Sequence, residues 1–456
     1  MNDHSGNLFE FAADFARRPL SPALADAAAL RLTDTLGCAV YGGGQEWTQI
    51  LLKTVSHARG NATAFGSRMP LAAEAAALCN GTAAHGFELD DLLTDALAHP
   101  GAVVVPAVLA VAEEEEANGA DILKAIVAGY EVVGRLGRAL GPQASGRGWH
   151  LTGVAGPAAS AVGVGVLLGF DACKLANAVG IACASAGGNK SFTGSGGMVK
   201  RLHAGLASRA GVVAARLAAS GFTGPAGALD GQFGLLDVVA GAGKRAAELD
   251  ARLGETFEIL QTTVKIYPCC AVLQSTLQAL VTLQRDAGLR GDNFDIIKVG
   301  SSERAVTQNN ERKPADIMAA QYSLPFCTAL ALQGDPEDPR LFSNEALSDP
   351  MIRALMDKVT MYVDDRMHAA YPQSMGARVL AFMPGKGEVM AEVLDAHGTA
   401  RAPCSPAELE AKFKRLGGLA VGDDTAAWVL SAIAKLKQGG NVRTLSESLQ
   451  AACAYA

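Results

Sequence analysis

The sequence predicts a mainly α-helical protein with a smaller α+β domain inserted towards its C-terminal end. Ala, Gly, Leu and Val dominate the 456 residues, while aromatic residues make up 5% and charged residues 19%, which is typical of helices packed closely through small side chains. Segments with β-branched, alternating residues between Gly and Pro turns are concentrated late in the chain. Because 456 residues exceed what one hydrophobic core usually supports, we expect two domains.

The first part of the chain predicts a series of core helices. In "SPALADAAALRLTDTLGCAVYG", Ser21 is placed to cap a helix and Pro22 stands at its first position, followed by apolar residues at helical spacing. The four glutamates 113–116 are most simply a solvated helix end. Further helices are expected at about 72–85, 102–117, 120–140, 153–168, 172–186 and 200–219.

The second part predicts strands, after which the helical pattern returns. Strands are expected at 294–302, 358–365, 377–387 and 387–398. Ser405 and Glu408 then form an S-x-x-E capping box, with Pro406 at the first helical position. We therefore predict an all-helical domain from residues 1–268 and 402–456 and an α+β domain from residues 269–401.

Composition and charge exclude several classes of function. The 39 Lys and Arg residues against 46 Asp and Glu residues give a net charge of −7 with no long basic run, so we expect no nucleic-acid partner. Nine scattered cysteines without a C-x-x-C pair fit a reducing cytosol, and the first residues do not resemble a signal peptide. The uncharged run 151–170 is long enough for a membrane span, but its Gly, Ala and Ser content favours a buried helix. We expect a cytoplasmic protein without a membrane partner.

Chemistry-bearing residues concentrate in "HGFELDDLLTDALAHPGAVVVPAV", residues 85–108. Glu88, Asp90, Asp91 and His99 lie there beside an apolar wall, where a helix ends and another begins. His99 could serve as a base or simply cap the following helix. On a helix, Asp90 and Asp91 would point about 100° apart, so one of them is expected to be structural.

Two further segments place basic residues beside glycines. His150 lies in "SGRGWHLTG", with the same two interpretations as His99, and Lys200 follows glycines 194, 196 and 197 in "GSGGMVKRLHAG". Backbone amides at a helix start attract anions, so Lys200 is interpreted as an anion anchor. The alternative is that Lys200, Arg201 and His203 form a solvated helix face, and the spacing is neither a Walker A loop nor G-x-G-x-x-G.

No set of residues has metal-ligand spacing. Cys269 and Cys270 lack further thiolates nearby, and neither H-E-x-x-H nor paired C-x-x-C occurs. We therefore expect neither metal nor cofactor, so that acid, base and anion-binding groups carry out any reaction.

Several ordered motifs resemble the MmgE/PrpD family nearly end to end. They are "GTAAHGFELDD", "AHPGAVVVPAVLAVAE", "GWHLTG", "VKRLHAG", "GFTGPAGALDGQFG", "KIYPCC", "AAQYSLPFCTALALQG" and "ELEAKFKRLGG". Members include 2-methylcitrate dehydratase, cis-aconitate decarboxylase and iminodisuccinate epimerase. The resemblance implies a large helical domain, a smaller α+β lid domain, a homodimer, no metal, and a site between the domains.

The resemblance also assigns site residues, with two departures. The family's acidic cluster, H-P, loop histidine, K-x-x-H and K-x-Y-P elements fall on His85, Glu88, Asp90, Asp91, His99, His150, Lys200, His203, Lys265 and Tyr267. Glu88 replaces an aspartate, and Gln274 replaces a histidine. Because glutamine is neither an acid nor a base near neutral pH, that histidine's role in the decarboxylase cannot be transferred.

The shared chemistry of the family is a reaction at a carbon next to a carboxylate in a small di- or tricarboxylate. We expect His99, His150, Asp90 and Lys200 to be catalytic, with His99 or His150 as the base. We expect the substrate to contact Glu88, Asp91, Arg201, His203, Lys265, Tyr267 and Gln274. A 2-methylcitrate dehydratase-like hydro-lyase is the first hypothesis; an epimerase, a cis-aconitate decarboxylase-like lyase and a non-catalytic carboxylate-binding protein are the alternatives.

Overall fold

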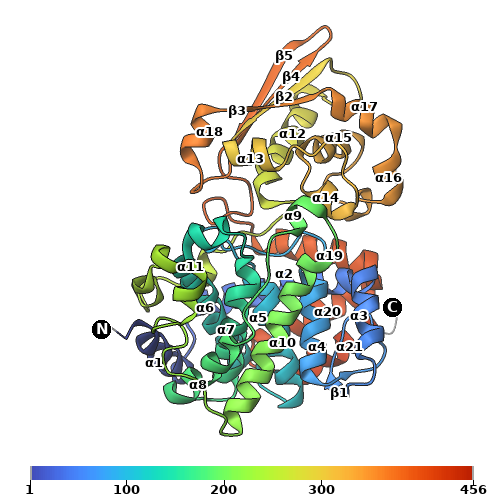
Figure 1. Ribbon diagram of the computed structural model, residues 1–456. Coiled ribbons are helices and arrows are strands. Elements are labelled where there is room, and N and C mark those ends of the chain that lie inside the picture. Colours follow the sequence, from blue (N-terminus) through green and yellow to red (C-terminus); the bar gives the residue numbers. More distant parts are fainter. Residues whose placement is uncertain (1–2, 454–456) are drawn as a thin grey trace.

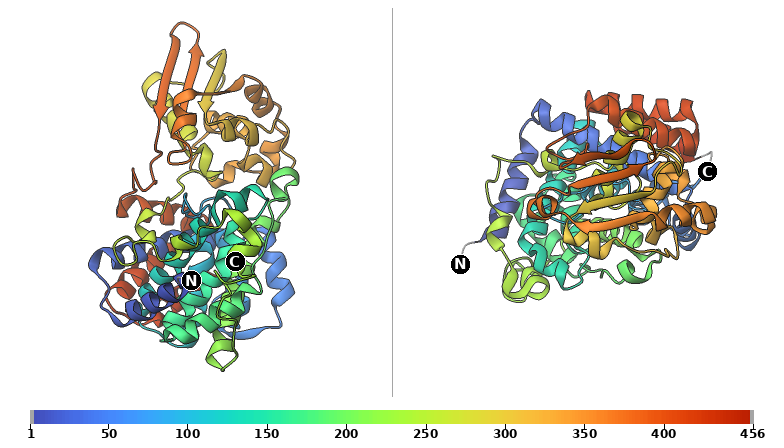
Figure 2. Two further views of the ribbon diagram at one scale, coloured as in Figure 1. Left: turned by 60° about the vertical axis from the view of Figure 1, so that its left-hand side comes forward. Right: turned by 90° about the horizontal axis from the view of Figure 1, so that it is seen from above.

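A computed structural model describes residues 3–453, apart from the side chains at 194 and 195. It has a large helical part, above which lies a smaller part that contains a mixed sheet (Figure 1). Seen from above, the strands run across the top of the helical part (Figure 2). The predicted fold class, mainly helical with a smaller α+β part, is confirmed.

The helical part is built from both ends of the chain. Its N-terminal elements are α1 (His4–Arg17), α2 (Pro22–Gly43), α3 (Glu46–Val55), β1 (Arg59–Ala62), α4 (Ala73–Ala84), α5 (Pro100–Glu114), α6 (Gly119–Gly146), α7 (Leu151–Leu167), α8 (Ala172–Cys183), α9 (Phe192–Ser195), α10 (Val199–Ala219) and α11 (Leu235–Ala240). Its C-terminal elements are α19 (Pro406–Val421), α20 (Asp423–Lys437) and α21 (Val442–Cys453).

The upper part holds a four-stranded sheet in the order β3-β2-β4-β5, in which β2 is parallel to β3 and antiparallel to β4. The strands are β2 (Ile296–Ser301), β3 (Val359–Val363), β4 (Ala377–Met383) and β5 (Gly387–Val393). The helices are α12 (Gln274–Ala287), α13 (Glu303–Gln308), α14 (Ile317–Gln321), α15 (Leu324–Gln333), α16 (Asn344–Ser348), α17 (Pro350–Asp357) and α18 (Asp365–Ala370). All four predicted strands occur.

Local signals at helix ends are confirmed. The Ser21 side chain accepts a hydrogen bond from the Leu24 amide at the start of α2, and Ser405 and Glu408 form both halves of the capping box of α19. The uncharged run forms α7, whose residues 151–166 are buried by neighbouring helices. Within residues 3–453, no helix is long and apolar enough to cross a membrane.

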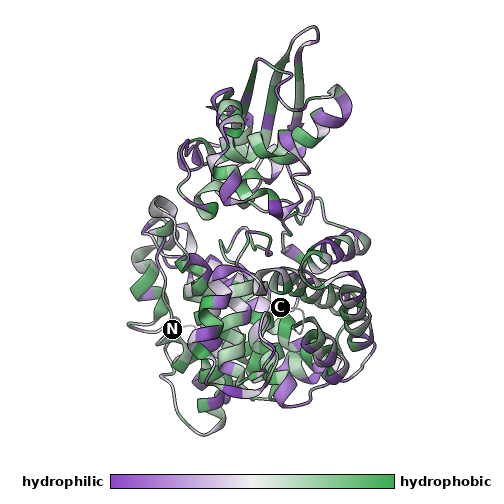
Figure 3. Cartoon of the chain, turned by 90° about the vertical axis from the view of Figure 1, so that its right-hand side faces the viewer, coloured by the Kyte–Doolittle hydropathy of each residue, from purple (hydrophilic) through white to green (hydrophobic). Residues whose placement is uncertain are grey.

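Glycines let the central helices approach one another closely. A Cβ atom at Gly205 of α10 would lie 2.2 Å from the Leu78 carbonyl oxygen of α4, and one at Gly211 would lie 2.2 Å from the Ser160 Cβ atom of α7. In Figure 3 the helices of the lower part carry hydrophobic and hydrophilic colours side by side. Because both contacts involve backbone or Cβ atoms, α10 has little freedom to shift, and its first turn is held in place.

The prediction that the four glutamates 113–116 are a solvated helix end is wrong for the first two. The Glu113 carboxylate accepts hydrogen bonds from the backbone and hydroxyl of Thr63. Glu114 accepts from the Ala73 amide at the start of α4 and pairs with Arg216 of α10. These partners lie far away in sequence, so the charge run alone could not indicate that its first half joins other elements.

Helix α19, from the C-terminal end of the chain, contacts both α2 and the loop that follows α4. Lys412 of α19 is buried, and its Nζ atom lies 2.7 Å from Asp34 Oδ1 of α2 and 2.7 Å from the Leu89 carbonyl oxygen. The domain division at residues 1–268, 269–401 and 402–456 stays a proposal, which the packing of α19 against α2 supports.

We predict that Lys412→Met destabilises the protein by about 3–5 kcal/mol, because it leaves the buried Asp34 carboxylate without its cation. Urea denaturation followed by circular dichroism measures the loss. The control is Lys437→Met, which removes an exposed pair with Asp26 and is expected to cost at most about 1 kcal/mol. Equal stabilities of the two variants would contradict the prediction.

Candidate active site

The loop between α4 and α5 positions the acidic cluster. His85 ends α4, and the chain then runs without helix to Pro100, held by Leu92, which exchanges two backbone hydrogen bonds with Thr263. Asp90 and Asp91 are therefore not helical, so the reason given for their divergence is wrong. Asp91 accepts hydrogen bonds from the Gly101 amide at 2.9 Å and the Tyr130 hydroxyl at 2.6 Å, whereas Asp90 turns towards the histidines.

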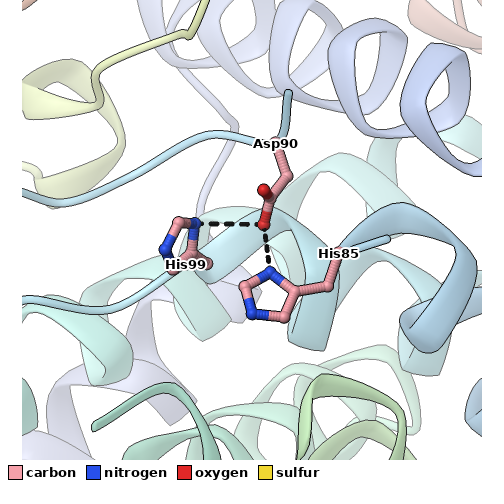
Figure 4. Close-up of side chains that lie close together, drawn as sticks. All are labelled: His85, Asp90 and His99. Atoms are coloured by element: carbon pink, nitrogen blue, oxygen red, sulfur yellow. Dashed lines mark hydrogen bonds and ion pairs between the residues drawn. The ribbon is translucent and has the colours of Figure 1, made fainter. Parts of the chain in front are cut away.

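Asp90 is a shared partner of two histidines (Figure 4). Its Oδ2 atom lies 2.6 Å from Nδ1 of His85 and 3.0 Å from Nδ1 of His99. The His99 Nδ1 also lies 2.8 Å from the Asp91 carbonyl oxygen, which can only accept. Neutral His99 therefore carries its proton on Nδ1 and its lone pair on Nε2. Its side chain does not cap α5, contrary to the alternative interpretation.

Two more histidines extend this array. The ring of His150, at the start of α7, stacks on His85 with centroids 5.7 Å apart, and its Nδ1 lies 3.0 Å from Nδ1 of His203 in α10. His85 is fully buried, and its Nε2 has no hydrogen-bond partner among the described residues. The four imidazoles thus form a row from the Asp90 carboxylate to α10.

A buried cluster of opposite charges lies beside the histidines. The Lys265 Nζ atom is 3.1 Å from Glu88 Oε2 and 3.3 Å from Asp90 Oδ1, and Glu88 also pairs with Lys200. The two lysines are almost inaccessible, so Lys200 is not part of a solvated helix face. Glu88 has a φ of 57°, a left-handed conformation that costs a side-chain residue free energy and directs its carboxylate between the two ammonium groups.

Charges and burial set the protonation of these groups. Although burial raises it, His99, His85 and Lys265 together hold the pKa of Asp90 well below its ordinary value. Burial and the neighbouring histidines lower the pKa of His150 well below its ordinary value, and burial and Lys200 lower that of His203. These shifts favour neutral His150 and His203, and a bound polyanion would raise the pKa values of both.

Besides Asp91, three predicted substrate contacts are engaged elsewhere. Arg201 donates from Nε to the Gly86 carbonyl oxygen at 2.7 Å, with its guanidinium 3.9 Å from the Trp47 ring centroid, so it supports the turn after α4. Gln274 accepts at Oε1 from the Ile266 and Tyr267 amides and donates to the Tyr267 carbonyl oxygen. These bonds fold the segment that presents Lys265. Tyr267 packs in the apolar cluster of the upper part.

Sequence reasoning left out several neighbours of the array. His85 belongs to the acidic-cluster motif, which predicts no role for it, although it is central to the row. Tyr322 lies with its ring centroid 5.2 Å from Lys200 Nζ, and Phe192 of α9 packs 5.3 Å from the ring of His150. "AAQYSLPFC" contributes to the family resemblance, but nothing in its spacing singles out Tyr322.

One group among the described residues has enough ligand atoms close together to hold a metal: His85, Asp90 and His99. Its distances of 2.6 and 3.0 Å fit hydrogen bonds, whereas two ligands of a tetrahedral zinc ion lie about 3.3 Å apart. The ammonium group of Lys265, which faces the same carboxylate, would also repel a divalent cation. The geometry thus favours a hydrogen-bonded acid–base array, and metal independence stays a prediction.

We predict that His85 makes the protein sensitive to acid. Burial lowers the pKa of His85 from 6.5 to about 3, so its contribution to stability is complete above pH 6.5 and is lost as the pH falls towards 3. Between pH 7 and pH 5 the loss should be about 2 kcal/mol.

His85→Asn keeps a donor for Asp90 but does not titrate, so its free energy of unfolding should fall by about 2 kcal/mol less over this interval. Urea denaturation at both pH values makes the comparison. An identical pH dependence in the variant and the wild type would show that His85 is not the group responsible.

Comparison with known proteins gives the family of the chain. A cis-aconitate decarboxylase-like protein of Aspergillus oryzae is 26% identical over 438 residues, which cover 91% of this chain and 90% of that protein. Cis-aconitate decarboxylase of Aspergillus terreus is 29% identical over 323 residues, 66% of each chain. The human cis-aconitate decarboxylase is 34% identical over 173 residues, 37% of this chain and 34% of that protein.

Two family domains match successive parts of the chain. Residues 6–247 match the MmgE/PrpD N-terminal domain, and residues 267–437 match the MmgE/PrpD C-terminal domain. Together they span most of the 456 residues. The family resemblance drawn from the motifs is thereby confirmed, and the chain belongs to the MmgE/PrpD family.

Proposed function

We propose that this protein is a cofactor-independent lyase that acts at a carbon next to a carboxylate of a small tricarboxylate, with decarboxylation of a cis-aconitate-like acid as the preferred reaction. The observation that carries the proposal is the meeting of two buried lysines, Lys200 and Lys265, with the row of four histidines. Such a site can hold a polyanion through fixed cations and move a proton beside it.

The charge balance of the reaction fits such a site. When CO2 leaves a carbon next to a double bond, its electron pair forms a new double bond, and the far carbon of the old double bond takes up one proton. The reaction therefore needs cations for the remaining carboxylates and one proton donor. Lys265 supplies one cation. Burial and Lys265 lower the pKa of Lys200 well below its ordinary value, so Lys200 acts as a cation where a carboxylate contacts it, as Glu88 does here and as the substrate would. His150 is our choice for the donor because substrate charge would raise its lowered pKa.

Glu88 gives the site a further property. Its carboxylate bridges Lys200 and Lys265, as a substrate carboxylate could. A substrate that brings several carboxylates can compete for these lysines, whereas a monocarboxylate would replace one charge by another without gain. This supports a tricarboxylate or dicarboxylate over simpler acids.

The comparisons favour decarboxylation over the dehydration expected first. The relatives described above are named cis-aconitate decarboxylases or decarboxylase-like. Dehydration of a 2-methylcitrate-like acid remains the second candidate because of one observation. Gln274 stands where the decarboxylase pattern has a histidine, and its amide is occupied by backbone groups.

We expect cis-aconitate to lose CO2 when the protein is incubated with a panel of polycarboxylates in heavy water. Proton NMR should show one deuterium at the former double-bond carbon, because solvent supplies the proton. EDTA should leave the rate unchanged. Water loss from 2-methylcitrate with cis-aconitate untouched would establish the dehydratase instead. Exchange without net reaction would indicate an epimerase, and binding alone a non-catalytic protein.

Lys200→Met should lower kcat/KM about ten- to a hundredfold on the acid that the panel identifies, because one charge-assisted contact of roughly 1.5–3 kcal/mol is lost. The variant should also be less stable, since Glu88 loses one of its two buried cations. Circular dichroism must therefore confirm folding at the assay temperature.

The matched control is Lys174→Met, which changes an exposed lysine and should leave kcat/KM within about twofold. A folded Lys200→Met variant with kcat/KM equal to that control would remove Lys200 from the site.

A further inference from the structure

We propose that His203 is a positioning residue that holds His150 in the single tautomer in which its Nε2 atom can take up a proton and give it to the substrate. The inference rests on the proposed function, because it specifies how the proton donor of that reaction is kept ready. It departs from the expectation that His203 binds the substrate.

The two imidazoles are fixed relative to each other. Their Nδ1 atoms are 3.0 Å apart, and both residues are largely buried. Gly188 contacts both residues: its carbonyl oxygen accepts a hydrogen bond from the His150 amide at 3.0 Å, and a Cβ added to it would lie 3.1 Å from the His203 Nδ1. A hydrogen bond between two Nδ1 atoms requires one donor and one acceptor.

The direction of this hydrogen bond decides what His150 can do. If the Nδ1–H group of His203 donated, neutral His150 would hold its proton on Nε2. Transfer of that proton to the substrate would leave His150 as an imidazolate anion, which is too basic to form near neutral pH. If His150 donates, its Nδ1 keeps its proton in both charge states, and Nε2 alone gains or loses one. Only the second arrangement gives a histidine that acts as an acid at Nε2 without rearranging its partner.

A neutral group that orients a histidine does not raise the pKa of that histidine as a carboxylate does. His150 faces His85, His99, Asp90, His203 and the Phe192 ring. Lys200 lies close enough to His203 to disfavour a charge there. His203 therefore orients His150 without adding negative charge, so His150 stays neutral until a polyanion arrives. His99, by contrast, is oriented beside the Asp90 carboxylate.

The proton balance of the step is then complete. The polyanionic substrate favours uptake of one proton at His150 Nε2 from solvent. That proton moves to the substrate carbon while the bond to the departing carboxylate breaks and CO2 leaves. The Nδ1 proton remains shared with His203 throughout, and solvent protonates Nε2 again for the next substrate molecule.

Three substitutions of His203 separate this role from others. His203→Asn presents an amide oxygen near the position of Nδ1, so it should keep kcat within about threefold of wild type. His203→Ala removes the acceptor and should lower kcat roughly ten- to a hundredfold with KM within about twofold. His203→Asp supplies a carboxylate, which should move the alkaline limb of the kcat profile to higher pH by about 1–3 units. The control is His57→Ala, which alters an exposed histidine.

Several outcomes would overturn the proposal. One is a kcat of His203→Asn as low as that of His203→Ala. Another is an effect of His203→Ala mainly on KM and not on kcat. A third is a pH profile of kcat that is the same in His203→Asp and the wild type. Nitrogen-15 NMR of labelled histidines tests the tautomer without turnover: His150 should be protonated on Nδ1 and titrate at Nε2 when citrate is added. Neutral His150 protonated on Nε2 would refute the inference. Absence of turnover on every polycarboxylate, with the expected tautomer present, would instead refute the proposed function.

Discussion

Two lysines and two carboxylates that pair with one another in the protein interior constrain the rest of the site. Lys200 and Lys265 face the carboxylates of Glu88 and Asp90, and all four side chains are almost inaccessible. An unpaired charge in such surroundings costs several kcal/mol, so no member can leave without a replacement. The first turn of α10, the loop after α4 and the segment before α12 are consequently tied together by electrostatics.

Other contacts hold these three elements in the positions in which the ion pairs form. Close packing at Gly205 and Gly211 limits the movement of α10 against α4 and α7. Arg201 supports the turn after α4, and Gln274 gathers the backbone that presents Lys265. Two residues that the motifs predict to contact the substrate therefore position the lysines instead. Buried polar side chains commonly bond to backbone groups.

The histidines differ mainly in what orients them. Asp90 and the Asp91 carbonyl oxygen leave His99 with a free lone pair on Nε2, as a base requires. His150 instead meets the imidazole of His203, and burial together with the neighbouring histidines keeps the pKa of His150 low. Two imidazoles a short distance apart can therefore hold different protonation roles, which suits a reaction that moves one proton in a charged substrate.

The sequence by itself was sufficient for features that depend on neighbours along the chain. The caps at Ser21 and Ser405, the strands between 294 and 398 and the buried helix at 151–167 follow from local spacing and composition. The ordered motifs also indicated the family and most residues of the array, because the order of motifs along the chain can be read without the three-dimensional structure.

Only the tertiary structure decided which of these residues meet. Asp90 and Asp91 are adjacent in sequence but face different partners, and Glu113 satisfies Thr63 although it belongs to a run of like charges. The bridge from Glu88 to Lys200 and Lys265 spans 112 and 177 residues of chain. Such contacts depend on how whole helices pack, and neither residue type nor spacing carries that information.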